Sequence, residues 1–321
     1  MLTLNGEYQY WCFNGLGYSR NGEICINPSR YVIVDADSGT AATVDAAWDV
    51  AGVLRFVEGL GATVTAALYT HRHEDHVGGR SPTSGSLRAG AMDMASAGAT
   101  VFCMDADADS VEQSTETVVT RLVDGGIVPL GAHTITAIAT PTHTPTKWCF
   151  LAGTAGGTVE SEVVFTGDTL FVGGFGRMSL EAGTGDVGAM FSSLARLAQL
   201  GGGTAVLAGH HFGAQRISNI GDEMRHNAAY RCATAAQLAA LAGIAPGGPI
   251  RMNPAAGSAV TSSILDGLDF SGVLVPNALA NAPPVLVLQP DGRGSTPAPR
   301  YDSRRVLLRR PQRFPCSGHG D

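Results

Sequence analysis

Three histidines and two acidic residues are crowded into residues 70–77, which read Thr-His-Arg-His-Glu-Asp-His-Val. His71, His73, Asp75 and His76 offer imidazole and carboxylate groups, the ligands that hold borderline divalent metals such as zinc; imidazole also suits iron. A lone histidine is more often a packed side chain, but this many competent ligands within one short segment are hard to explain by packing. The sequence therefore predicts a metal site on this loop.

Three further ligand candidates, His143, Asp168 and His210, lie downstream, and each follows an apolar or alternating stretch typical of a strand. Gly167 and Gly209 directly precede the last two. Because strand ends can converge on one edge of a sheet, we expect these side chains to join the same site. His211 adjoins His210 and is an alternative ligand at that position.

The elements that must position these residues can be predicted from periodicity and from turn residues. We expect a hairpin over residues 31–45 with its turn at 37–39, and strands over 64–69, 100–104, 134–139, 163–166 and 205–208. Helical spacing covers residues 48–60, 89–98 and 187–200, and glycines follow the first and last of these helices. Residues 111–123 read as a mixed segment.

Taken together, the motifs resemble the metallo-β-lactamase superfamily over about residues 31–230. The resemblance implies an α+β fold, a four-layer αββα sandwich. It also implies two zinc ions per chain, with iron or a zinc–iron pair as alternatives. His71, His73 and His143 would hold one metal, Asp75, His76 and His210 the second, and Asp168 would bridge both. Asp45 is similar to the family's first-strand aspartate, which supports the metal loop.

Within the superfamily, the segment from Phe165 to Arg177 resembles glyoxalase II, the hydroxyacylglutathione hydrolase. That likeness implies a hydrolase of glutathione thioesters, in which a metal-bound hydroxide attacks the thioester carbonyl. Asp75 would be the catalytic residue that orients the hydroxide and can accept its proton. Arg177 would bind the glycine carboxylate of glutathione, since a guanidinium can pair with both oxygens. A surface salt bridge is the competing interpretation of Arg177.

An alternative is a persulfide dioxygenase, because residues 218–227 resemble a segment of those enzymes. They hold a single Fe(II) with two histidines and one carboxylate, here the counterparts of His71, His143 and Asp168. Both subfamilies retain all seven ligand positions, so the ligand set does not separate them. A third interpretation is a degenerate scaffold that binds metal without catalysis.

Charge and composition restrict the partners. The 321 residues have a formal net charge of −7. Residues 1–243 hold 23 acidic side chains against 13 basic ones, which disfavours a nucleic-acid substrate. The chain contains one lysine, Lys147, which we interpret as a compositional bias. We expect a glutathione-derived small-molecule substrate, no nucleic acid and no membrane, and a monomer or homodimer.

Changes in residue composition along the chain predict three parts. Residues 1–30 would form an N-terminal extension or edge hairpin, 31–243 the catalytic domain, and 244–321 a poorly ordered tail. The tail holds 11 of the 16 prolines, which disfavours regular elements. Six dispersed cysteines without a Cys-x-x-Cys pair, and no secretory signal or long apolar span, predict a reducing compartment. We expect the cytoplasm, with an organelle interior as the alternative.

Overall fold

The structure is a computed structural model, and it describes residues 2–4, 8–18, 24–81, 85–142, 147–154, 162–176, 186–210 and 217–242. For residues before Ser29 only the backbone is described. The tail expected over residues 244–321 lies outside the described residues, as do His143, Arg177 and His211.

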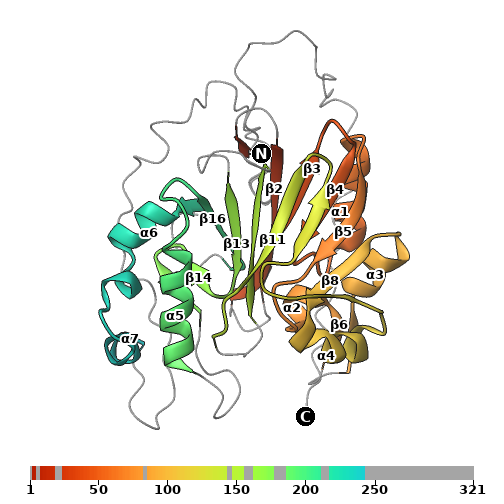
Figure 1. The fold of residues 1–321 in the computed structure, drawn as a ribbon. Helices are drawn as coiled ribbons and strands as arrows, with labels where there is room; N and C mark the ends of the chain where they lie inside the picture. Colours follow the sequence, from red (N-terminus) through yellow and green to blue (C-terminus); the bar gives the residue numbers. More distant parts are fainter. Residues whose placement is uncertain are drawn as a thin grey trace.

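Two β-sheets form the centre of the molecule (Figure 1). The first contains, in spatial order, β1 (Leu2–Leu4), β2 (Tyr8–Tyr18), β3 (Ile24–Asp35), β4 (Thr40–Val44), β5 (Thr63–Leu68), β8 (Thr100–Met104) and β9 (Thr120–Leu122). The second contains β10 (Ile127–Leu130), β11 (His133–Ala139), β12 (Trp148–Thr154), β13 (Val163–Gly167), β16 (Ala205–Ala208) and β17 (Ile217–Asn219). Two small ribbons pair β6 (Gly79–Arg80) with β7 (Leu87–Arg88), and β14 (Leu170–Phe171) with β15 (Gly174–Phe175).

Alternation along the strands builds the layers. In β3, Tyr31 and Ile33 pack into the core between the sheets, whereas Val32 and Val34 point to the opposite face. The core between the sheets takes Phe150 and Phe165 from the second sheet. Each sheet is therefore apolar on both faces, and each outer face needs a covering layer.

Helices supply those covering layers (Figure 1). The outer face of the first sheet packs against α1 (Val50–Gly59), α3 (Ala91–Ser96) and α4 (Asp105–Thr115). The outer face of the second packs against α5 (Val187–Leu197), α6 (Ile220–His226), the 3-10 turn η2 (Ala228–Arg231) and α7 (Ala235–Leu241). The short α2 (Glu74–Val77) carries part of the histidine-rich loop. The predicted αββα sandwich is confirmed.

The predicted hairpin over residues 31–45 is present as β3 and β4, and β3 itself begins earlier, at Ile24. The predicted helices are shorter than their patterns: α1 begins after Asp49, whose side chain accepts a hydrogen bond from the Gly52 backbone and caps the helix. The mixed segment divides after α4, whose last residue, Thr115, is followed by Glu116 with a left-handed φ of 56°; β9 comes next.

At the end of β4 that lies away from the histidine-rich loop, a buried carboxylate joins the two sheets. Asp35 pairs with Thr40 at the start of β4, and its side chain accepts hydrogen bonds from the backbone N–H groups of Ser38 (2.9 Å) and Ala132 (3.1 Å). His133 Nε2 lies 3.4 Å from Asp35 Oδ2. We call Asp35, Ser38, Ala132 and His133 the far-end cluster.

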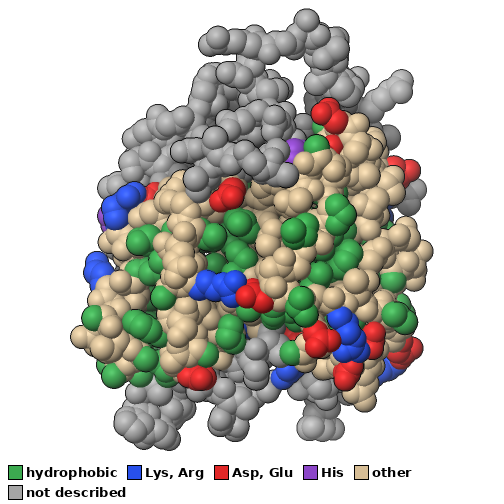
Figure 2. All heavy atoms as spheres, viewed as in Figure 1, with side chains coloured by type: hydrophobic (Ala, Val, Ile, Leu, Met, Phe, Trp, Pro, Cys, Tyr) green, Lys and Arg blue, Asp and Glu red, His purple; other side chains and the backbone are tan. Residues whose placement is uncertain are grey.

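The surface carries both signs of charge. On the face shown in Figure 2, basic and acidic side chains of the described residues alternate with apolar ones and form no continuous basic area. Among the described residues no helix is both long enough and apolar enough to cross a membrane.

Candidate metal centre

The first histidine of the loop is oriented through a relay of hydrogen bonds. Asp45, which directly follows β4 and has a φ of 53°, accepts bonds from the Thr70 N–H and the Thr70 hydroxyl, both at 2.8 Å. Because that hydroxyl donates to Asp45, its oxygen is left to accept from His71 Nδ1, 3.1 Å away. This assignment places the proton of a neutral His71 on Nδ1 and its lone pair on Nε2, the atom turned toward His73 and Asp168.

Asp45 also orients a second imidazole. His76 lies on α2 and is fully buried, and its Nδ1 is 3.0 Å from Asp45 Oδ2. A proton on Nδ1 turns the Nε2 lone pair toward the site, the arrangement that metal-binding histidines usually have. One carboxylate thus sets two imidazole rings, His76 directly and His71 through Thr70.

The loop is also tied to α4. The Arg72 backbone donates to Asp107 Oδ2 (3.1 Å), and the Arg72 guanidinium donates to Asp107 Oδ1 (3.2 Å). Asp107 is 1% exposed, so the pair is largely shielded on the carboxylate side. The residue between His71 and His73 therefore anchors the loop to the layer behind it.

The second sheet brings its carboxylate to the same place by close backbone packing. Asp168 follows β13 at Gly167, whose φ is 47° and whose missing Cβ would lie 2.6 Å from Thr70 Oγ1. Gly209 donates its N–H to Gly167 O (2.7 Å), and a Cβ at Gly209 would lie 2.8 Å from Asp168 Oδ1. Glycine is needed at both positions because the loops of the two sheets meet there.

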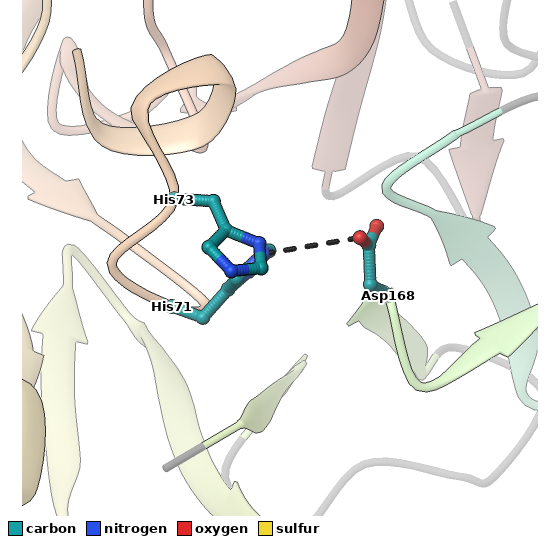
Figure 3. Close-up of side chains that lie close together, drawn as sticks. All are labelled: His71, His73 and Asp168. Carbon is teal, nitrogen blue, oxygen red and sulfur yellow. Dashed lines mark hydrogen bonds and ion pairs between the residues drawn. The ribbon is translucent and has the colours of Figure 1, made fainter. Parts of the chain in front are cut away.

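Six of the predicted ligands form two groups. The first ligand group is His71, His73 and Asp168, and the second ligand group is Asp75, His76 and His210; the ligand atoms of each lie within 4.8 Å of one another. Figure 3 shows the first group, with the Asp168 carboxylate turned toward the two imidazoles; its Oδ2 is 3.8 Å from His71 Nε2. Asp168 Oδ1 faces the second group, 3.6 Å from His76 Nε2 and 3.4 Å from His210 Nε2.

These donor atoms fit a divalent metal. His71 Nε2 and His73 Nδ1 are 2.9 Å apart, and His76 Nε2 and His210 Nε2 are 3.2 Å apart. Two nitrogens bound to one tetrahedral zinc at about 2.1 Å would lie roughly 3.4 Å apart. Asp168 Oδ1 is buried and makes no hydrogen bond. A buried acceptor of this kind is costly unless a cation completes it.

The charges of the site favour cation binding. Burial would raise the pKa of Asp168, but Lys147 and the neighbouring histidines outweigh burial and hold that pKa well below its usual range. Burial would likewise lower the pKa of His76, yet Asp75, Asp168 and Asp45 raise it to about 9. The carboxylates thus attract a proton to His76 when no metal is bound, and a metal would displace that proton.

The pKa of His73 is shifted in the opposite direction from that of His76. Burial and the positive charge of Lys147 lower the pKa of His73 to about 4, which leaves its imidazole neutral at neutral pH. Burial also lowers the pKa of Lys147, opposed by Asp168. Asp75 is held below its usual pKa by His76 and His210, which outweigh its burial.

The predicted site residues divide in two. The structure brings together His71, His73, Asp75, His76, Asp168 and His210, whereas His143, Arg177 and His211 lie outside the described residues. Our ligand assignments stay predictions. The sequence analysis did not assign Lys147 to the site. Its side chain is 1% exposed, and its Nζ lies 3.3 Å from Asp168 Oδ2. The signal in the sequence was its position, four residues after His143 and directly before the apolar residues 148–152.

Known proteins are similar to this chain at the level of sequence. The family model of the metallo-beta-lactamase superfamily matches residues 105–210. A hydroxyacylglutathione hydrolase from Rhodospirillum rubrum is 31% identical over 188 residues, which are 59% of this chain and 64% of that protein. The "Probable polyketide biosynthesis zinc-dependent hydrolase PksB" of Bacillus subtilis is 27% identical over 198 residues, 61% of this chain and 79% of that protein.

The chain spans a little under two thirds of the length of the first hydroxyacylglutathione hydrolases that it matches. Among solved structures, a metallo-beta-lactamase from Staphylococcus aureus aligns with a TM-score of 0.58 at 23% identity, over 76% of this chain and 69% of that one. ETHE1 from Myxococcus xanthus aligns with a TM-score of 0.51 at 26% identity, over 67% of this chain and 83% of that one. Together with the αββα sandwich, these matches show that the chain has the metallo-β-lactamase fold.

Proposed function

We propose that this protein is a metal-dependent hydrolase of glutathione thioesters. The observation that carries the proposal is the meeting of two ligand groups around one carboxylate, Asp168, at the edge where both sheets end. The similarity to proteins named hydroxyacylglutathione hydrolase supports the choice of reaction and substrate. The catalytic domain is proposed to cover residues 31–243.

Two zinc ions per chain are the proposed cofactors, with iron or a zinc–iron pair as alternatives. The first ligand group, completed by His143, would hold one ion and the second ligand group the other, with Asp168 bridging. Bound metal at such a site lowers the pKa of water toward neutrality and polarises a carbonyl group. The protein's own part is to fix the ligands, which Asp45 does for two of the imidazoles.

Asp75 is the proposed catalytic side chain. Its carboxylate is 32% exposed, the most open of the second ligand group, and it lies 3.4 Å from His210 Nε2. His76 and His210 keep it ionised, so it presents an acceptor that can orient a nucleophilic water and take up its proton. The leaving group is a thiolate, which is stable enough to depart without a proton donor.

Substrate recognition is proposed to use Arg177, whose guanidinium would pair with the glycine carboxylate of glutathione. Replacement of Arg177 by alanine should raise KM for S-D-lactoylglutathione at least about tenfold while changing kcat little, because the carboxylate is remote from the reacting carbonyl. An unchanged KM would support the competing interpretation, in which Arg177 forms a surface salt bridge and does not bind the substrate.

The proposed activity is tested by incubating the protein with S-D-lactoylglutathione in the absence of oxygen and measuring the free thiol that hydrolysis releases. The alternative, a persulfide dioxygenase, is supported by the likeness to the ETHE1 structure. If this protein is a dioxygenase, it should consume oxygen with glutathione persulfide and contain about one iron per chain, held by His71, His143 and Asp168. Thiol release without oxygen supports the hydrolase, and oxygen uptake supports the dioxygenase. If neither reaction is observed, both proposals are rejected.

A further inference from the structure

The single lysine of the chain lies buried against the carboxylate that both ligand groups share. Lys147 is 1% exposed, and its Nζ is 3.3 Å from Asp168 Oδ2 and donates to the Asp168 backbone oxygen, also at 3.3 Å. Lysine is almost never fully buried unless its charge is paired. The resemblance to the superfamily assigned this residue no function.

The backbone fixes Lys147 between the two sheets. The Thr140 N–H donates to Lys147 O (2.9 Å), and the N–H of the next residue, Trp148, donates to Thr70 O (3.1 Å). Thr70 is the residue whose hydroxyl orients His71. The ammonium group therefore belongs to the residue directly before β12 and lies beside the first ligand group.

The two oxygens of Asp168 consequently have different surroundings. Oδ2, the oxygen turned to His71, is shared with the Lys147 ammonium. Oδ1, the oxygen turned to His76 and His210, makes no hydrogen bond. A cation in the first ligand group would meet the positive charge of Lys147 on the same carboxylate, whereas a cation in the second would meet a carboxylate oxygen that makes no hydrogen bond.

We propose that Lys147 is a positioning residue that makes the two metal sites unequal, so that the second ligand group loads first and the first ligand group binds its metal more weakly. The inference rests on the proposed metal binding and deepens it. Two like charges a few ångströms apart in a partly buried setting repel strongly enough to separate the two affinities by on the order of 100-fold.

The test is a zinc titration of the full chain stripped of metal with a chelator, followed by calorimetry and by competition with a chromogenic chelator. The unmodified protein should take up zinc in two steps whose dissociation constants differ by on the order of 100-fold. His210→Ala should abolish the tight step, and His73→Ala should abolish the weak step alone. Equal affinities, or loss of the tight step in His73→Ala, would overturn the inference.

Variants of Lys147 separate its charge from its packing. Lys147→Met removes the charge and keeps a long apolar stem, so the weak step should tighten at least about tenfold. Lys147→Arg keeps the charge and should keep the separation; Lys147→Gln replaces Lys147→Met if that variant does not fold by circular dichroism. An unchanged weak step, or a lost zinc equivalent, in the uncharged variant would overturn the proposal.

Failure of the inference can be told apart from failure of the proposed function. If zinc binds in two equal steps and thioester hydrolysis is observed, the hydrolase stands and the role of Lys147 is rejected. If the unmodified protein and Lys147→Met both bind no zinc, the metal centre itself is rejected, and with it both proposals.

Discussion

The two ends of the β-sandwich both bury carboxylates, but they use them in opposite ways. In the far-end cluster, both oxygens of Asp35 are occupied by backbone N–H groups and by His133. At the end that holds the two ligand groups, Asp168 Oδ1 is buried without a hydrogen bond, and imidazole nitrogens face one another. A satisfied carboxylate serves the fold, whereas an unsatisfied one beside other ligands is poised for a cation.

The largest effect that would sharpen this comparison is expected for Asp75→Asn. The amide oxygen is a weaker ligand and no longer accepts a proton, so turnover of S-D-lactoylglutathione should fall about 1,000-fold. The free energy of unfolding of the metal-free protein should change by less than about 1 kcal/mol, since Asp75 is partly exposed. Activity within tenfold of the unmodified protein would remove Asp75 from the catalytic role.

The next effect is expected for Asp45→Asn, which keeps the shape of the side chain and removes the charge that sets His76 and Thr70. Loss of such an outer partner typically weakens metal binding by about 10–100-fold. Zinc affinity, measured by chelator competition, should fall by that factor. Asp35→Asn is the matched control at the other end, and its zinc affinity should be unchanged.

Asp35→Asn should instead lower stability. Loss of hydrogen bonds to a buried charge costs about 2 kcal/mol, measured by urea unfolding at pH 7. Although burial opposes ionisation, the bonds from Ser38 and Ala132 hold the pKa of Asp35 below its ordinary value of 3.8. A carboxylate with a lowered pKa stabilises the fold above that ordinary value and loses its contribution as the pH falls through the folded value.

The stability difference between Asp35→Asn and the unmodified protein should therefore be full at pH 7 and shrink below about pH 4. Thioester turnover per folded molecule should stay the same in this variant. A constant difference across that pH range would show that the far-end cluster does not depend on the ionised carboxylate.

The smallest effects are expected from a matched pair of glycines. A methyl group at Gly209 would lie 2.8 Å from Asp168 Oδ1 and 2.8 Å from the Gly167 backbone, so Gly209→Ala should reduce zinc affinity several-fold and also lower the unfolding free energy. A methyl group at Gly131, whose φ is 57°, would collide with Asp35, so Gly131→Ala should lower the unfolding free energy by about 1–2 kcal/mol and leave zinc affinity unchanged. Both variants would be measured by thermal unfolding and by zinc competition. Weaker zinc binding in Gly131→Ala, with unchanged zinc binding in Gly209→Ala, would contradict the comparison.

The sequence indicated most of the side chains that gather in the two ligand groups, because residue type and neighbouring glycines are local features. The loop around His71 and His73, and the strand ends before Asp168 and His210, were recognisable from residue type and neighbouring glycines. The sandwich followed from the alternation of strands and helices. Asp168 lies 3.8 Å from His71, although nearly a hundred residues separate them in the chain.

Other features depend on contacts that no local pattern records. The link from Asp35 to Ala132 joins residues 97 positions apart, and nothing near either residue marks it. The final elements, β17, α6, η2 and α7, were not predicted because they are short and cover the second sheet with few apolar residues each. The burial of Lys147 was not predicted, because lysine is normally exposed and no local pattern marks its pairing with Asp168.

The burial of Lys147 has a practical consequence for chemical labelling. The chain offers an acylating reagent one ε-amine, and that amine is sealed beneath the meeting point of two sheets. Its modification requires the sheet edge to open, so the rate of acylation at residue 147 would report local unfolding at the site. Binding of a ligand that holds the edge closed should slow that reaction, which makes this single ε-amine an intrinsic footprinting probe.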